Sequence, residues 1–142
     1  MVEAPKNGYY DQLRADYHER RELLSQALQR AGLPVLPISG SYFLQTWFDH
    51  LPFDDDVAFS TWLIEHIGVT PIPPSAFYLD PVSAPKLVRW CFAKTPQTLA
   101  LAGDRLGRLP DVIAQQQTCP VQGRRDCWAT LFFYIRLLVG NE

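Results

Sequence analysis

The residue most suggestive of chemistry is an arginine inside an apolar run. Residues 86–94 read KLVRWCFAK, with Arg89 at their centre. Alternate side chains of a strand point to opposite faces, so Val88, Trp90 and Phe92 would share one bulky face and Arg89 would lie on the other. An unpaired buried charge costs on the order of several kcal/mol. We therefore expect an anion beside the Arg89 guanidinium.

The cysteines and histidines indicate no second reactive site. They are Cys91, Cys119, Cys127, His18, His50 and His66. The odd number of cysteines and the lack of CxxC spacing indicate neither a disulfide framework nor a zinc site, and a reducing cytoplasm is the expected compartment. The histidines are too widely spread for a metal triad. No base is identifiable near Cys91, so we expect a small buried thiol there.

The charge and hydropathy of the sequence indicate neither nucleic acid nor a membrane as a partner. The chain has 142 residues, a formal net charge of −2 and 47% hydrophobic residues, enough for one domain with a core. Its basic residues form no stripe for a phosphate backbone. The first ten residues hold no apolar run typical of a secretory signal. The apolar stretch from Ala129 to Val139 is interrupted by Arg136 and is shorter than the about 20 residues of a membrane span.

Three amphipathic helices are predicted. The first covers residues 9–31, with apolar residues three, four and seven apart, and Gly32 and Pro34 would end it. The second follows the three aspartates at 54–56 and closes on Gly68. The third has Thr95 as N-cap, then Pro96, and runs to Leu109. Apolar faces on these helices would pack on a sheet.

Four short strands complete the prediction. Residues 33–48 read as two strands around a turn at 39–41, and residues 86–94 as another. Between them, residues 69–81 read as an edge strand that leads into a loop, because Pro71, Pro73 and Pro74 cannot donate to a ladder. The order α-β-β-α-β-β-α predicts an α+β fold, a small sheet with helices on one side.

Three blocks of the sequence, in their order and spacing, resemble a known family. They are SGSYFL, DDVAFSTWLIEHIGVTPIPPSAFY and KLVRWCFAKTPQTL. Together they resemble the C-terminal small domain of class I/II pyridoxal-phosphate aminotransferases of fold type I, near the kynurenine/glutamine transaminases and methionine aminotransferases. The resemblance covers about residues 9–109. It implies a disordered N-terminus over 1–8, a small-domain segment over 9–109 and an atypical tail over 110–142.

The resemblance also implies a substrate site. Arg89 matches the family arginine that binds the substrate α-carboxylate, and a guanidinium can bind a carboxylate with two parallel hydrogen bonds. Gly40 and Tyr42 lie in a block similar to Gly-Thr-Tyr-Phe, with Ser41 in place of threonine. The segment 73–78 resembles the loop that covers the site. The alternatives are that Arg89 pairs with an aspartate such as Asp80, and that the aromatic residues are plain core.

The family's cofactor chemistry is not matched by this chain. The resemblance implies pyridoxal phosphate held on a lysine of a large domain, yet the lysines are Lys6, Lys86 and Lys94, outside any such motif. No catalytic residue is therefore predicted here. We expect a fragment that supplies the carboxylate clamp and is inactive alone, from a truncated or mispredicted gene product or one with a readthrough tail.

The expected partners follow from the same resemblance. They are an amino acid or 2-oxo acid substrate, and a large cofactor domain or a homodimer partner. Two alternatives are a free-standing amino-acid-binding module and a non-catalytic remnant that binds another protein. Exposed surface of a former domain interface would favour self-association.

Overall fold

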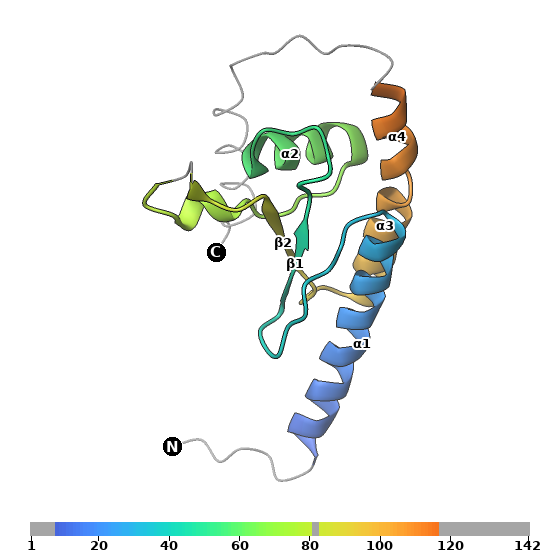
Figure 1. The fold of residues 1–142 in the computed structure, drawn as a ribbon. Helices are drawn as coiled ribbons and strands as arrows, with labels where there is room; N and C mark the ends of the chain where they lie inside the picture. The colour runs from blue at the N-terminus through green and yellow to red at the C-terminus, as the bar shows by residue number, and fades with distance from the viewer. Residues whose placement is uncertain (1–7, 81–82, 117–142) are drawn as a thin grey trace, which may run out of the picture.

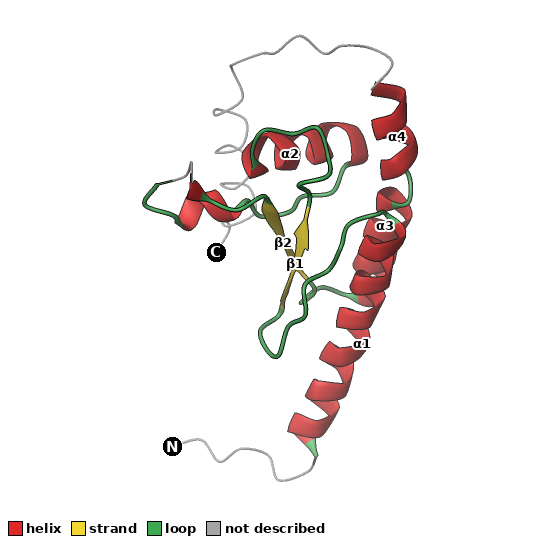
Figure 2. Ribbon diagram, viewed as in Figure 1, coloured by secondary structure: helices red, strands yellow, loops and turns green. Residues whose placement is uncertain are grey.

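The computed structural model describes residues 8–80 and 83–116 (Figure 1). The elements in chain order are α1 (Tyr9–Arg30), β1 (Phe43–Trp47), α2 (Asp56–Trp62), a π-helical turn (Leu63–Ile67), a 3₁₀ turn (Pro74–Phe77), β2 (Leu87–Cys91), α3 (Pro96–Leu106) and α4 (Leu109–Gln116). This mixture of helices with a small antiparallel sheet confirms the α+β class (Figure 2). The expectations for Lys6, Cys119, Cys127, residues 1–7 and residues 117–142 lie outside the described ranges.

β1 and β2 form an antiparallel pair whose register puts Gln45 opposite Arg89. The two other expected strands take part only through single bridges, one between Val35 and Thr46 and one between Ile72 and Arg89. Prolines on both sides of Ile72 have no N–H to extend the ladder. The sheet therefore has a two-stranded centre with one short contact at each edge, and Ile72 lies at an edge as predicted.

The two faces of the strand pair differ as the alternation predicted. Val88, Trp90 and Phe92 are all buried, whereas Arg89 on the opposite face is only partly buried. Thr46, which is also fully buried, accepts a 2.8 Å hydrogen bond from the indole Nε1 of Trp90. This bond joins the two strands inside the core, where a polar group without a partner would be costly.

α1 and α3 lie side by side on the core (Figure 1). Leu24, Ala27 and Leu28 of α1 are buried, and Gly103 of α3 comes so close that an added Cβ would stand 3.2 Å from the Cβ of Ala27. The first turns of α1 extend beyond the rest of the fold, so Tyr10, on the predicted apolar face, is 57% exposed. The apolar face of α1 therefore extends further toward the N-terminus than the part of the helix that packs in the core.

α2 begins at the predicted aspartates. The Asp55 side chain accepts a 2.7 Å hydrogen bond from the backbone N–H of Ala58 and caps the helix. The helix then widens into the π-helical turn and ends at Gly68, whose φ of 75° is left-handed as the C-cap prediction requires. Arg105 donates to the Gly68 carbonyl at 2.7 Å and Arg108 to the Ile67 carbonyl at 3.3 Å, so α3 and the link after it satisfy the end of this turn.

The third helix has the predicted start. Thr95 is the N-cap, its hydroxyl accepts from the Thr98 N–H at 3.3 Å, and Pro96 is the first helical residue. The chain breaks at Gly107 and continues as α4, which was not expected as a separate helix. Leu109 and Ile113 of α4 pack in the core, so the described start of the tail belongs to the folded unit. None of the helices within 8–80 and 83–116 has the length and apolar character that a membrane span requires.

Candidate functional site

Arg89 lies on the outer face of the strand pair between two aromatic rings. Its Cζ is 4.1 Å from the ring centroid of Phe43 on β1 and 5.0 Å from that of Phe77 in the 3₁₀ turn. A cation beside an aromatic ring is attracted by the ring quadrupole. Cation–π contacts with Phe43 and Phe77 therefore favour this position of the guanidinium.

The hydrogen-bonding capacity of Arg89 is incompletely used. Its Nε is buried and has no hydrogen-bond partner. Within the described ranges Arg21 forms an ion pair with Glu22, and the Nδ1 of His50 lies 3.7 Å from the Oδ1 of Asp49, but no such contact joins Arg89 to Asp80. Most buried polar groups are hydrogen-bonded, and an exception calls for a specific explanation. A bound anion would supply the missing acceptor.

The backbone fixes Arg89 from both sides. On one side β1 pairs with it through Gln45, and on the other its N–H donates to the Ile72 carbonyl at 3.0 Å while its carbonyl accepts from the Ile72 N–H at 2.8 Å. Ile72 lies two residues before the 3₁₀ turn. This bridge therefore brings the Phe77 segment, far from β1 in sequence, next to Arg89.

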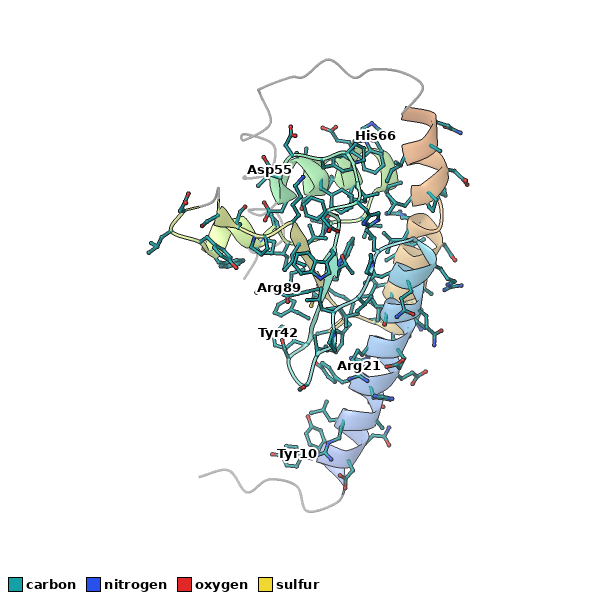
Figure 3. All side chains as sticks on the ribbon, in the orientation of Figure 1. Tyr10, Arg21, Tyr42, Asp55, His66 and Arg89 are labelled. Carbon is teal, nitrogen blue, oxygen red and sulfur yellow. The ribbon has the colours of Figure 1, made fainter. Side chains whose placement is uncertain are left out.

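Tyr42 joins the same cluster through its neighbour. Its ring centroid is 4.5 Å from that of Phe43, and its carbonyl accepts a 3.0 Å hydrogen bond from the Phe92 N–H. Figure 3 shows Tyr42 and Arg89 on the same side of the strand pair, away from α1. Tyr42 is 51% exposed, so its ring is open to solvent beside the site.

Gly40 lies in the exposed turn before Tyr42, and the structure gives no direct contact between it and Arg89. A Cβ at Gly40 would meet nothing within 4 Å, so there is no steric requirement for glycine there. The unusual backbone in this turn is instead at Ser41, whose φ is 72°. The substrate-binding role of Gly40 stays a prediction.

The loop residues around the site are exposed rather than core. Phe77 is 67% exposed and Tyr78 45% exposed, which argues against plain core packing for both. Sequence reasoning missed Phe43 as the inner ring beside Arg89. The alternation of a strand predicts that Phe43 and Gln45 share a face of β1. Only the register with β2 shows that this face lies beside Arg89.

The remaining candidates do not assemble around Arg89. Cys91 is a free, partly buried thiol on β2, and the Nδ1 of His66 is 3.0 Å from the carbonyl of Trp62 in the second helix. Within the part of the chain that the structure describes, no three His, Cys, Asp or Glu side chains form a group that could hold a metal ion.

The chain belongs to the family described as aminotransferase class I and II. The family model matches residues 1–106. The chain is 42% identical over 93 residues to the methionine aminotransferase of Escherichia coli, with 66% of this chain and 24% of that protein covered. It is 33% identical over 113 residues to kynurenine–oxoglutarate transaminase 1 of Mus musculus, with 70% of this chain and 27% of that protein covered. The resemblance seen in the sequence is thereby confirmed.

Solved structures agree with the sequence comparisons. The Escherichia coli protein YbdL, identified with a methionine aminotransferase function, matches with a TM-score of 0.67 and 39% identity over 74% of this chain and 27% of that one. The N-succinyldiaminopimelate aminotransferase of Mycobacterium tuberculosis matches with a TM-score of 0.64 and 34% identity, over 74% of this chain and 27% of that chain. The chain spans about a quarter of the length of the relatives it matches.

Pyridoxal phosphate, which the family generally uses, does not fit the described residues by themselves. A cofactor site of this kind needs a lysine amine free to form a Schiff base. Lys86 donates to the carbonyl of Phe53 at 2.8 Å and is out of phase with Arg89 along the strand, and Lys94 is exposed after β2. The described residues alone therefore provide no lysine for the cofactor.

Proposed function

We propose that this chain supplies the substrate-carboxylate-binding part of an aminotransferase, with Arg89 as the residue that binds the α-carboxylate of an amino acid or 2-oxo acid. One observation supports this role above the others. The Nε of Arg89 is buried without an acceptor while the cation lies against Phe43 and Phe77. A carboxylate would complete both the charge and the hydrogen bonds of this group.

The role of Arg89 in such a reaction is to orient the substrate. Its five N–H donors lie in one plane, so two parallel hydrogen bonds fix both the position and the rotation of a carboxylate. The strand pairing and the Ile72 bridge hold the Arg89 backbone rigid. A rigid anchor of this kind holds the Cα of the bound acid in a fixed place relative to the groups that react with it.

The whole reaction that we propose is transfer of an amino group between an amino acid and a 2-oxo acid. Pyridoxal phosphate, when bound, supplies the electron sink for that chemistry. We propose a large cofactor-binding domain and a second copy of the protein as the partners that complete the site, in the cytoplasm. Tyr42 and Gly40 would line the substrate side. Neither nucleic acid nor a membrane is proposed as a partner.

Calorimetric titration of the full chain with L-methionine, L-kynurenine and L-glutamine tests the Arg89 role. We expect binding that Arg89→Ala weakens by about 10- to 100-fold, the equivalent of losing a hydrogen-bonded charge. Arg89→Lys keeps the charge but not the planar fork, so it should also bind more weakly than the wild type. Arg14→Ala, an exposed change on α1, serves as the matched control and should bind like the wild type.

Methioninamide, which lacks the carboxylate, provides the ligand control. We expect it to bind no better to the wild-type chain than methionine binds to the Arg89→Ala variant. Equal affinity of the wild type and Arg89→Ala for methionine would contradict the assignment. So would the absence of methionine binding by the wild-type chain, because the Arg89 guanidinium already lies against Phe43 and Phe77 without a ligand.

A further inference from the structure

A buried carboxylate on α2 holds the turn that carries Phe77. Asp56 is the first residue of α2 and, within the described ranges, the one charged residue that is buried, at 3% exposure. Its Oδ2 accepts a 2.7 Å hydrogen bond from the backbone N–H of Ser75, which is also buried. This bond joins two segments that are 19 residues apart in the sequence.

Asp56 is not needed to cap its own helix. That role belongs to its neighbour, because the Asp55 side chain accepts from the N–H of Ala58. Burying a carboxylate is expensive unless charge-assisted hydrogen bonds compensate. The position of Asp56 at the positive end of α2 favours its negative charge, but the hydrogen bond that it accepts from the Ser75 N–H is directed out of the helix.

Ser75 is directly connected to the candidate site. It lies inside the 3₁₀ turn Pro74–Phe77, two residues before Phe77. The Phe77 ring, 5.0 Å from the Cζ of Arg89, is 67% exposed, so little core packing holds it in place. The position of this ring therefore depends on how the turn is fixed at its buried end.

We propose that Asp56 is a positioning residue for carboxylate binding: through Ser75 it holds the Pro74–Phe77 turn so that Phe77 lies against the guanidinium of Arg89. This inference rests on the proposed function of Arg89. Asp56 itself touches no substrate in this arrangement. Its effect reaches the site through the backbone of the turn and the ring of Phe77.

The test uses NMR spectroscopy of the full chain and its variants. It measures the geometry of the turn separately from ligand binding. Two signals report the geometry without any ligand. Hydrogen exchange of the Ser75 amide reports its bond to Asp56, and the chemical shift of the Arg89 Nε–H reports the nearby rings. The variants are Asp56→Ala, Asp56→Asn, Phe77→Ala as a reference for loss of the ring, and Asp55→Ala as the matched control.

In Asp56→Ala we expect the Ser75 amide to exchange about 10- to 100-fold faster, as for the loss of a hydrogen bond to a charged group. The Arg89 Nε–H signal should move in the same direction as in Phe77→Ala. Asp56→Asn retains an acceptor oxygen in a neutral, weaker bond, so both effects should be smaller. Asp55→Ala weakens the start of α2. It should leave the exchange rate of the Ser75 amide, relative to neighbouring core amides, and the chemical shift of the Arg89 Nε–H at their wild-type values.

The same samples are then titrated with L-methionine. We expect Asp56→Ala to weaken binding in proportion to the displacement of the Arg89 signal, and Asp55→Ala to leave binding unchanged. The inference is overturned if Asp56→Ala leaves the Ser75 amide protected and the Arg89 signal in place. It is also overturned if Asp55→Ala shifts the two signals as much as Asp56→Ala does, because Asp56 would then have only a general structural effect.

Failure of the proposed function gives a different pattern. If the wild-type chain binds no methionine while Asp56→Ala still releases Ser75 and moves the Arg89 signal, Asp56 positions the turn but Arg89 is not a carboxylate site. If methionine binding is lost in Arg89→Ala yet unaffected when Asp56→Ala releases the turn, Arg89 binds carboxylate without help from Asp56. Carboxylate binding by Arg89 and positioning of the turn by Asp56 can therefore be refuted independently.

Discussion

The hydrogen bond between Trp90 and Thr46 offers a sharp test of the core. Thr46→Val replaces the hydroxyl with a methyl group of similar size, so it opens no cavity. It removes the acceptor that lies 2.8 Å from the indole Nε1 of Trp90, at a position with 0% exposure. The indole N–H would then be buried without a partner.

The expected loss follows from that burial. Leaving a buried donor unsatisfied costs about 1–3 kcal/mol, more than the net value of an ordinary exposed hydrogen bond. For a domain of about 100 residues, each kcal/mol lowers the melting temperature by about 4–8 °C. We therefore expect Thr46→Val to melt at least about 4 °C below the wild type.

Circular dichroism melts, supported by urea unfolding, measure this difference, and the chain contains its own control. Thr61 has a buried hydroxyl oxygen with no hydrogen-bond partner. Thr61→Val makes the same chemical change without breaking a bond, so it should be neutral or stabilising. A Thr46→Val variant as stable as Thr61→Val would show that the Trp90 bond contributes nothing, and would refute the reasoning.

Two further substitutions test the packing and the helix end. Gly68→Ala should lower the free energy of unfolding by about 1 kcal/mol or more, because φ is 75° and the new Cβ would stand 3.2 Å from the Nη1 of Arg105; an unchanged urea midpoint would count against it. Leu28→Ala should cost about 2–5 kcal/mol in the same assay, since Leu28 is fully buried. Leu13→Ala, on the exposed part of α1, should cost far less, and equal losses would contradict the observed core.

The elements with strong local signals were predictable. Thr95 and Pro96 marked the start of α3, and Gly68 marked the end of the second helical segment, because caps depend on a few neighbouring residues. The alternation around Arg89 gave the correct buried face of β2, since a strand with one face in the core must keep that register. These features depend on chemistry within a few residues of each position.

Features that depend on distant pairing were not predictable. The π-helical turn before Gly68 is stabilised partly by Arg105 and Arg108, which lie about forty residues away along the chain. The aspartate run indicated a cap, but not that Asp56 would bind Ser75 instead of its own helix. Likewise, only the strand register places Phe43 beside Arg89. Arg89 could be singled out as a candidate from the sequence, whereas the contacts around it required the fold.

The measurement that tests the central claim most directly is the NMR signal of the Arg89 Nε–H during titration of the wild-type chain with L-methionine. This atom is the buried donor without a partner, so a bound carboxylate should shift it and slow its exchange with solvent. Methioninamide should leave it unmoved. An Arg89 signal that stays unchanged with methionine, or that responds equally to methioninamide, would contradict carboxylate binding by Arg89.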